Sequence, residues 1–378
     1  MRAMKNSVLL LCFSPLRRDP RVLRQLRLLR ETYDVATCGF GPAPDGVEEH
    51  YEIPDARTAW WPTDLKYAGA YLAARQFARF YRHEPRVKAA LELVPKGRFD
   101  VILANDLNTV PLALLLEPHR GVHADLHEWE PRLPGSGINW RLLGLPYSGW
   151  HLRQAQRASS VTTVAPGIAA AYEREYGLSS AVVTNAADYA EQEPQPVAAP
   201  LRLVHSGGSN PARRLDLMIE AMRGVEGATL EFMLMSTGEG AIDALKKQAA
   251  GMDNVTFRDP VPYADLVPTL NAYDVGVFLL PPTNYNYEMA LPNKLYEYLQ
   301  ARLGIVIGPS PEMARVVREH GLGVVSEDFT AESFREAIRA LTVATVREFK
   351  QNSHRAAGEL SSEMAARPWV EAIEAILR

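Results

Sequence analysis

Short apolar runs alternate with segments of helical periodicity along the whole chain. The runs are rich in β-branched or aliphatic residues, as strands buried in a parallel sheet are. In the first half they are Ser7 to Phe13, Asp34 to Gly39, Asp100 to Asn105, Val122 to Leu126 and Ser160 to Val164. This alternation predicts an α/β fold in which helices cover both faces of parallel sheets.

The first predicted helix follows the first strand and has an apolar face and a basic face. Its apolar positions recur at helical spacing: Val22, Leu23, Leu26 and Leu29. Three basic residues occupy the opposite face: Arg21, Arg24 and Arg27. We therefore expect the helix to bury its apolar face and to expose these arginines to water.

A segment without periodicity divides the chain. Residues 186–200 gather Pro, Ala and acidic side chains, as a linker does. A second series of strand-like runs follows it: Leu201 to His205, Thr229 to Met235, Asn254 to Arg258, Asp274 to Leu280, Gly304 to Ile307 and Gly323 to Val325. This series predicts a second Rossmann-like unit.

The length of 378 residues favours two domains, and two domains imply a cleft. We expect an N-terminal Rossmann-like domain over residues 1–190 and a C-terminal one over residues 191–345. Residues 346–378 show only helical signals and are expected to pack across the domain junction. An insertion from Trp60 to Lys96 interleaves aromatic residues with arginines. It either contacts a lipid-linked acceptor or buries its aromatics in the first domain, and the second interpretation is favoured.

Composition narrows the class of protein. An apolar content of 47% and a charged content of 23% are those of a globular protein. The net charge of −4 argues against nucleic-acid binding, which needs a basic excess. Cys12 and Cys38 form no disulfide framework, and no apolar run approaches the ~20 residues of a membrane span. We expect a cytoplasmic protein with at most peripheral contact at the inner membrane face.

Two loops of the second half carry candidate anion-binding residues. The first runs from Ser206 to Arg214 after a strand, and the second leads from Met289 into a helix at Pro292, which suits the first helical position. Adjacent glycines allow close approach of backbone to a ligand, and the start of a helix favours negative charge. Arg213 and Lys294 are the candidate cations for a diphosphate, and the other candidate residues of this binding site are Gly207, Gly208, Ser209, Asn210, Arg214, Met289, Ala290, Leu291 and Asn293. A plain turn with solvent-facing arginines remains the alternative for the first loop.

Other candidate residues follow strands of the first half, at the sheet edge where α/β proteins bind ligands. His127 and Glu128 follow one strand, and Asn105 and Asp106 end another. Together with the loop after the first strand they form one candidate ligand-binding set, which consists of Arg17, Arg18, Asp19, Asn105, Asp106 and Glu128. Alternatively, the loop residues only cap helices or expose their charges to solvent. His127 could likewise have a structural role and contact no ligand.

A resemblance to a known family connects these segments. Residues 292–317, PNKLYEYLQARLGIVIGPSPEMARVV, resemble the donor-site signature of retaining GT-B glycosyltransferases of family four, also called glycosyl transferases group 1. Segments similar to other stretches of that family are Asp19-Pro20-Arg21-Val22, Asp125-Leu126-His127-Glu128-Trp129 and Asn185-Ala186. The resemblance implies the GT-B fold, in which two Rossmann-like domains face a central cleft. It also implies that the first domain binds the acceptor, through the candidate set at its strand ends and first loop, and that the second binds the nucleotide sugar.

The resemblance also implies roles for single residues. Family members often supply a Gly-Arg pair and a Lys to the diphosphate; here Gly207 keeps the glycine, Gly208 replaces the Arg and Arg213 replaces the Lys. Of the two glutamates that many members carry, Glu297 matches the ribose ligand, whereas Glu288 is one position out of register with the sugar ligand. A histidine in the position of His127 often faces the transferred sugar. The expected catalytic residues are Arg213, Lys294, His127 and Glu288.

The expected reaction is transfer of a sugar from a UDP- or GDP-sugar to a sugar, lipid-linked or small-molecule acceptor. The resemblance implies a hexosyltransferase-like enzyme that retains the anomeric configuration, in glycan, glycolipid or natural-product biosynthesis. No Asp-x-Asp motif or His/Cys cluster is present. We therefore expect no metal and no cofactor, with cationic side chains stabilising the leaving diphosphate.

Other functions remain open. A dehydrogenase is disfavoured because Phe13 to Arg18 replaces the glycine fingerprint after the first strand. A nucleotide-sugar epimerase of the same architecture is the rival enzyme. The nonenzymatic alternative is a silent GT-B subunit, which the missing arginine at Gly208 and the shifted Glu288 motivate.

Overall fold

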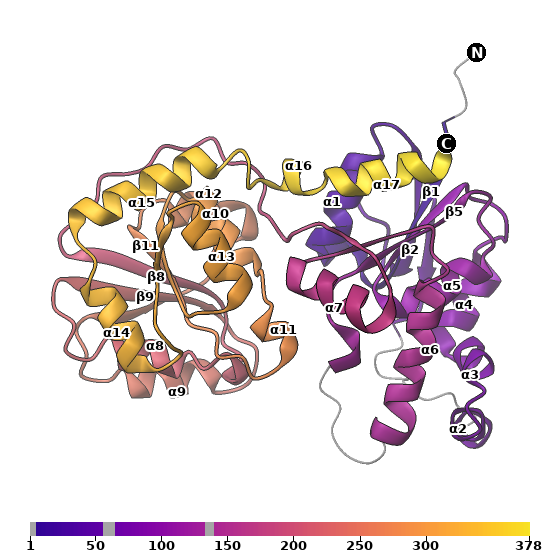
Figure 1. Cartoon of the computed structure of the whole chain (residues 1–378), viewed down its shortest axis with the longest axis horizontal. Helices are drawn as coiled ribbons and strands as arrows, with labels where there is room; N and C mark the ends of the chain where they lie inside the picture. Colours follow the sequence, from indigo (N-terminus) through magenta and orange to yellow (C-terminus); the bar gives the residue numbers. More distant parts are fainter. Residues whose placement is uncertain (1–4, 56–64, 133–139) are drawn as a thin grey trace. The chain divides into compact units, whose positions relative to one another are not determined.

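The computed structural model describes residues 5–55, 65–132 and 140–378. The chain forms two compact units (Figure 1). The first unit comprises Met1–Val183 and Ala366–Arg378, and the second comprises Thr184–Ala365. The chain therefore leaves the first unit after Val183 and returns to it at Ala366, where the sequence-based division uses residues 190 and 345.

The first unit is built on a sheet of seven parallel strands in the order β3-β2-β1-β4-β5-β6-β7. The strands are β1 (Ser7–Pro15), β2 (Asp34–Phe40), β3 (His50–Ile53), β4 (Val101–Asn105), β5 (Gly121–Leu126), β6 (Ser160–Thr163) and β7 (Ala181–Val182). The central strands are apolar because helices cover both faces of a parallel sheet. Leu9 of β1, for example, lies between Ala36 of β2 and Ile102 of β4 and is fully buried.

Helices of the first unit follow its strands. They are α1 (Pro20–Leu29), α2 (Leu65–Ala73), α3 (Phe77–His83), α4 (Pro85–Leu93), α5 (Val110–Leu115), α6 (Leu145–Ala155), α7 (Pro166–Tyr176) and α17 (Arg367–Leu377). Short turns are η1 (Leu16–Arg18), η3 (Leu107–Thr109), η4 (Glu130–Arg132) and η5 (Trp140–Gly144). The C-terminal helix α17, yellow in Figure 1, contacts α1, β4, β5 and β6, so the last residues complete the first unit.

The second unit has a sheet of six parallel strands in the order β10-β9-β8-β11-β12-β13. The strands are β8 (Leu201–Gly208), β9 (Ala228–Met235), β10 (Val255–Arg258), β11 (Val275–Phe278), β12 (Gly304–Ile307) and β13 (Gly323–Val325). In sequence order this is 3-2-1-4-5-6, the Rossmann arrangement.

Apart from the short α16, which lies on the chain segment that leads to α17, the helices of the second unit lie around this sheet in Figure 1. They are α8 (Asp216–Ala221), α9 (Ala241–Gln248), α10 (Tyr263–Leu270), α11 (Tyr285–Glu288), α12 (Asn293–Gln300), α13 (Pro311–Glu319), α14 (Ala331–Arg339), α15 (Val343–Ala356) and α16 (Ser362–Ala365), with the turn η6 (Pro211–Arg213). A core of aliphatic and aromatic side chains from β8, β9, β11 and α8, among them Leu203, Met218, Phe232 and Val277, fills its interior.

The segment between the units has no helix or strand from Val183 to Ala198, which agrees with the loss of periodicity in the sequence. It is held by hydrogen bonds within the second unit. Arg302 Nη2 donates to the carbonyl of Ala190 at 2.5 Å, and the amide of Ala190 donates to Gln300 Oε1 at 3.1 Å. Part of this segment is therefore fixed to the second unit by hydrogen bonds and is not a freely moving linker.

The insertion forms α2, α3 and α4 in its described part, and Trp60 and Trp61 lie outside the described residues. Phe77, Phe80 and Tyr81 are buried, as the favoured interpretation of this segment predicts. Tyr147 of α6 packs against Phe77 and Phe80, with ring centroids 5.7 and 5.1 Å apart. Along the described parts of the chain, no helix is long and apolar enough to cross a membrane.

Candidate functional site

The strand order of the second unit places two predicted loops at one edge of its sheet. β8 and β11 are neighbours, and the strand order reverses between them. In such sheets ligands bind outside the carboxyl ends of the strands at this reversal. β8 ends in Gly207 and Gly208, and the chain after β11 leads through α11 into α12. The two loops predicted to bind an anion therefore converge.

Gly207 marks the point of closest approach between these loops. Its φ of +137° suits glycine, and a Cβ at this position would meet the Lys294 ammonium and lie 3.9 Å from Nη1 of Arg213. Lys294 and Arg213 thus point to the same stretch of backbone. At Gly208 a Cβ would meet Cγ2 of Thr237 at 2.8 Å, so a larger side chain does not fit there without rearrangement.

Lys294 is a buried cation without a counter-ion among the described residues. It is 8% exposed, and its Nζ lies 5.4 Å from the centroid of the Phe278 ring. Burial, together with the nearby charge of Arg213, lowers the pKa of Lys294 to about 8, while Glu297 opposes this change. A buried charge without a partner is unfavourable. A bound anion would relieve this cost.

Backbone amides add to the positive potential at this edge. Those of Ala290, Leu291, Asn293 and Lys294 donate to no described residue, because they lie in or before the first turn of α12. Met289 differs from the expectation: its amide donates to the carbonyl of Tyr285 at 3.0 Å and closes α11. Pro292 is the residue before the first helical position, one place earlier than predicted.

The two glutamates of this region occupy different environments. Glu297 of α12 is 6% exposed, and burial raises its pKa, whereas the charge of Lys294 lowers it. Glu288, at the end of α11, is exposed, and its side chain forms no hydrogen bond or ion pair with another described residue. Only Glu297 is therefore built into the same buried cluster as Lys294.

Three further residues of the first loop are engaged in local structure. Ser209 Oγ accepts a hydrogen bond from the amide of Thr237 at 3.1 Å, and Asn210 caps η6 by accepting from the amide of Ala212 at 2.9 Å. Arg214 forms a salt bridge with Asp216 at 2.8 Å. The loop leads into the short turn η6 and then α8, which begins only at Asp216. The side chain of Arg213, in contrast, forms no ion pair or hydrogen bond with another residue that the structure describes.

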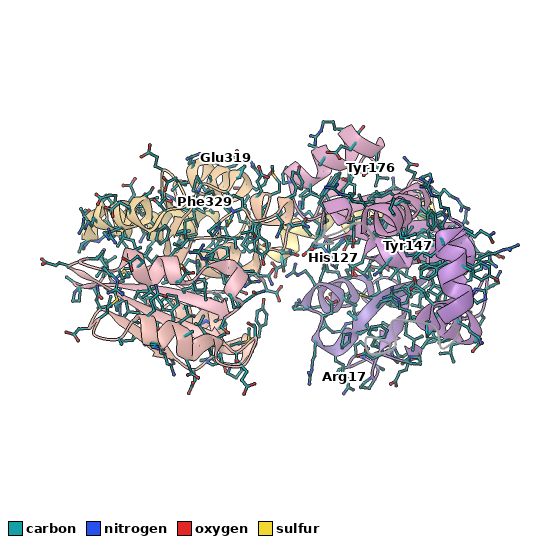
Figure 2. All side chains as sticks on the ribbon, turned by 90° about the horizontal axis from the view of Figure 1, so that it is seen from below. Arg17, His127, Tyr147, Tyr176, Glu319 and Phe329 are labelled. Carbon is teal, nitrogen blue, oxygen red and sulfur yellow. The ribbon has the colours of Figure 1, made fainter. Side chains whose placement is uncertain are left out.

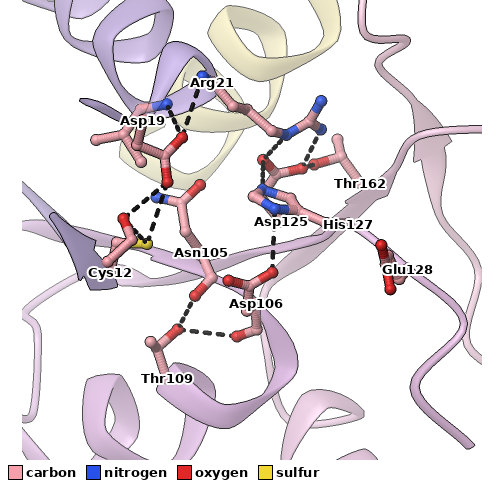
Figure 3. A network of polar contacts seen from close by, with 12 residues as sticks. Cys12, Asp19, Arg21, Asn105, Asp106, Thr109, Asp125, His127, Glu128 and Thr162 are labelled. Carbon is pink, nitrogen blue, oxygen red and sulfur yellow. Dashed lines mark hydrogen bonds and ion pairs between the residues drawn. The ribbon is translucent and has the colours of Figure 1, made fainter. Parts of the chain in front are cut away.

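The first unit contains a network of polar side chains at the carboxyl ends of β1, β4 and β5 (Figure 3). Its centre is Asp125, which is fully buried on β5. Arg21 Nε donates to Asp125 Oδ2 and Arg21 Nη2 donates to Oδ1, each at 2.7 Å. The expectation that Arg21 and Arg24 face solvent is wrong: they are 6% and 7% exposed. The buried carboxylate on β5 draws Arg21 inward.

Two uncharged side chains complete the surroundings of Asp125. Gln25 Nε2 donates to Oδ2 at 2.8 Å, and Thr162 Oγ1 donates to Oδ1 at 2.7 Å. Burial alone would raise the pKa of Asp125, but Arg21 and His127 hold it well below its usual value. Asp125 is therefore a permanent carboxylate in a dry environment.

His127 lies between two carboxylates. Its Nδ1 is 3.0 Å from Asp106 Oδ1, and its Nε2 is 3.4 Å from Asp125 Oδ2. Burial would lower the pKa of His127, but Asp106 and Asp125 raise it to about 10. The ring is therefore an imidazolium at neutral pH and has no free lone pair for a proton. Asp106 adopts a φ of +68°, which is a strained backbone conformation for a residue other than glycine.

The residues expected on the acceptor side have several local roles. Asp19 caps α1 by accepting from the amides of Arg21 and Val22. Arg17 donates to the carbonyl of Ala43 at 2.7 Å and stands at the surface (Figure 2), and Arg18 is exposed. Asn105 is fully buried and accepts from Gln25 at 2.8 Å. Only Asp106 and Glu128 lie near His127 with some exposure to solvent.

Sequence reasoning missed four members of this region: Arg21, Asp125, Thr162 and Glu130. Asp125 ends a strand two positions before His127, and this spacing puts both on one side of the chain; it was the available signal. Glu130 follows in η4, where burial and the charges of Asp106 and Glu128 raise its pKa to about 7. No cluster of three or more His, Cys, Asp or Glu side chains that could hold a metal occurs in the described part of the chain.

These two units, each with a Rossmann-like parallel sheet, define a protein of the GT-B class. The chain resembles solved GT-B structures over almost its whole length. A sucrose-phosphate synthase from Thermosynechococcus elongatus gives a TM-score of 0.73 at 12% identity, covering 99% of both chains. A glycosyltransferase from Rickettsia africae gives 0.67 at 10% identity, with 99% of both chains covered. A trehalose-6-phosphate structure from E. coli bound with UDP-2-fluoro glucose gives 0.65 at 10% identity, covering 97% of this chain and 98% of that one.

A family model adds sequence evidence to the fold. Residues 200–343 match the family described as Glycosyl transferases group 1, which confirms the resemblance predicted from the donor-site signature. The match lies within the second unit and includes β8 with the loop after it and α12 with the loop before it. No curated protein sequence matches the chain.

Proposed function

We propose that the protein is a glycosyltransferase that moves a sugar from a nucleotide-diphosphate sugar to an acceptor hydroxyl. The observation that carries this proposal is the unpaired, buried Lys294 beside Gly207 and Arg213. Two cations that converge on glycine backbone form a site for a polyanion such as a diphosphate.

The chemistry of glycosyl transfer fits this site. As the bond between the sugar and the diphosphate breaks, negative charge grows on the departing phosphate and positive charge on the sugar. Lys294, Arg213 and the free amides of Ala290 and Leu291 would stabilise the departing group. Because these donors are already in place, little reorganisation is needed during the reaction. We infer that they take the role that a divalent metal ion has in other transferases.

Glu297 supplies the second contact of the proposed donor site. Its carboxylate lies on the same helix as Lys294, one turn further along, and can accept hydrogen bonds from two ribose hydroxyls. Glu288 does not share this buried environment. We therefore propose that Lys294, Arg213 and Glu297 contact the donor, and we assign no donor contact to Glu288.

The comparisons support the choice of donor. One similar structure is described with UDP-2-fluoro glucose, and a Staphylococcus aureus TarM structure, at a TM-score of 0.58 and 10% identity, is described with UDP. The family match covers the unit that holds the proposed site. We propose a UDP- or GDP-sugar as donor and retention of the anomeric configuration, in which the leaving phosphate takes the acceptor proton.

Calorimetric titration with UDP and GDP tests the donor site. Lys294→Met and Arg213→Ala are each expected to weaken binding about 10- to 100-fold, because a hydrogen bond to a charged group contributes about 1.5–3 kcal/mol. Arg214→Ala is the matched control, since Arg214 already pairs with Asp216, and its affinity should stay within about twofold. Equal losses in all three variants would contradict the proposed site.

Product analysis separates transfer from the rival functions. Incubation with a nucleotide sugar and a panel of acceptors should give a glycoside and free nucleoside diphosphate. Conversion of the donor sugar without an acceptor would indicate an epimerase. Tight donor binding with neither transfer nor hydrolysis would indicate a silent partner subunit.

A further inference from the structure

Asp125 of the first unit is held from several directions by neighbouring polar side chains. Arg21 binds both of its oxygens, and Gln25 and Thr162 each bind one. The carboxylate therefore has almost no freedom to rotate. Its fifth contact is His127 Nε2 at 3.4 Å.

The direction of the Thr162 hydroxyl is fixed by a neighbour. Because this hydroxyl donates its proton to Asp125, its oxygen accepts from His123 Nε2, which lies 3.0 Å away. His123 Nδ1 then accepts from the hydroxyl of Ser160 at 2.8 Å. Burial lowers the pKa of His123 to about 4, so this ring is neutral at pH 7. One of its nitrogens can then donate a hydrogen bond while the other accepts one. A directed chain of hydrogen bonds thus runs from β6 to Asp125.

Arg21 is fixed on its other side by the last helix of the chain. The guanidinium carbon lies 4.6 Å from the ring centroid of Trp369 in α17, and Nη1 donates to the carbonyl of Val183 at 3.1 Å. Trp369 is 1% exposed. Arg21 therefore cannot turn away from Asp125 without leaving an aromatic partner and a backbone carbonyl.

We propose that Asp125 is a positioning residue that fixes His127 as a cation and, through it, fixes the Asp106 carboxylate at the ligand-binding edge of the first unit. Both nitrogens of His127 face carboxylates, so the ring is a donor and cannot accept a proton (Figure 3). Asp106, with a side chain 35% exposed, is then the group that accepts a hydrogen bond from a sugar or acceptor hydroxyl. The role of Asp106 rests on the proposed function, whereas the state of His127 does not.

All charged groups near His127 enter this argument. They are Arg21 from α1, Asp106 after β4, Asp125 on β5, and Glu128 and Glu130 after β5. Arg21 opposes protonation of the ring, whereas the four carboxylates favour it. Asp106 and Asp125 are in direct contact with the ring, so they outweigh the single guanidinium.

Nuclear magnetic resonance of the histidine rings tests the state of His127 in the full chain. The protein is labelled at its histidine rings, and His127→Gln identifies the signals of His127. In the unaltered protein these signals should remain those of an imidazolium up to about pH 9, far above the ordinary value of about 6.5. A ring that titrates near 6.5 would overturn the proposal.

Asp125→Asn should lower the pKa of His127 by more than about one pH unit, because one of its two contacting carboxylates is lost. Asp100→Asn is the matched control: it removes a carboxylate of the same unit that binds Ser7 at the other end of β4, and it should leave His127 unchanged. If Asp125→Asn does not fold, the double variant with Arg21→Met removes both members of the buried pair and gives the same readout. An unchanged His127 in the folded variant would contradict the role of Asp125.

Kinetics distinguish positioning from a purely structural role. In the folded Asp125→Asn variant kcat for transfer should fall about tenfold or more, because Asp106 is misplaced, while the Kd for UDP stays unchanged. An unaltered kcat together with a lowered His127 pKa would overturn the positioning role. If the unaltered protein transfers no sugar at all, the proposed function fails, and the ring titration still decides the state of His127.

Discussion

At the scale of single residues, Lys294 combines near-complete burial with the absence of a counter-ion in the described part of the chain. Its ammonium is stable only because it overlies the Phe278 ring and because Gly207 leaves room for it. Such a residue lowers the stability of the free protein in exchange for affinity. Two expected outcomes follow from this position.

The first concerns pH. The pKa of Lys294 in the folded protein is lowered to about 8, below its value of about 10.4 in an unfolded chain. The charge therefore destabilises the fold fully below pH 8, and the cost disappears as pH rises toward the unfolded value. Lys294→Met should raise the melting temperature at pH 7, with a gain that shrinks above pH 8. In the unaltered protein UDP affinity should fall between pH 7 and 9, because Lys294 loses its charge in this range. The Lys294→Met variant should not show this fall. Parallel calorimetric titrations of the two proteins would measure the difference.

The second concerns Gly207. Gly207→Ala places a Cβ against the Lys294 ammonium at a φ of +137°, which costs about 1–3 kcal/mol in backbone strain. Chemical denaturation should show this loss, and UDP binding should weaken because Lys294 is displaced. Gly227→Ala is the control: it has a positive φ of +76° but nothing within 4 Å of the added atom, so stability falls while UDP affinity is retained. Unchanged UDP affinity in Gly207→Ala would show that the ammonium has room to move.

At the scale of elements, Asp19 was expected to bind a ligand, and in the structure its side chain caps the N-terminus of α1. Asp19 accepts from the amides of Arg21 and Val22 and from the hydroxyl of Ser14 at 2.7 Å. Asp19→Ala should therefore destabilise the protein by about 0.5–2 kcal/mol, the usual cost of removing such a cap. Denaturation measures the stability, and initial rates measure the KM for the acceptor. A changed KM at unchanged stability would return Asp19 to the acceptor site.

The strands were predictable because each central strand is a continuous apolar run. The sequence places β1, β2, β4, β5 and β6 within a few residues, and it misses β3 and β7. Those two are the edge strands of the first sheet, and they lack a buried apolar run: β3 buries only Ile53, and neither residue of β7 is fully buried. The bounds of α1 were also predictable from its periodicity, whereas the burial of Arg21 was not. Its partner Asp125 is 104 residues away, and local patterns contain no information about such a pair.

In the candidate site of the second unit, the cationic residues were predictable from the sequence, whereas the hydrogen-bond and ion-pair partners of the loop residues were not. Glycines after a strand and a Lys near a helix start identify Lys294 and Arg213 because these signals are local. The engagement of Arg214 with Asp216 and of the Met289 amide with Tyr285 depends on the exact ends of η6 and α11. Helix ends are the least certain part of any sequence-based assignment.

At the scale of the whole molecule, each unit has its own core and its own set of polar groups. The proposed donor ligands Lys294, Arg213 and Glu297 all belong to the second unit. Differential scanning calorimetry should therefore show two transitions, and UDP should raise only one of them, as a ligand stabilises only the part that binds it. Lys294→Met should remove this shift. A UDP-dependent rise of both transitions would contradict the assignment of the donor to one unit.

The return of the chain to its first unit at Ala366 has a consequence for synthesis. Trp369, which packs on Arg21, is synthesised after the whole second unit, which is one uninterrupted stretch of the chain. Nascent domains generally fold as units from the N-terminus onward. We expect the opposite order here: the second unit can reach its native state first, whereas the first unit is completed, and Arg21 is covered, only after α17 has been synthesised.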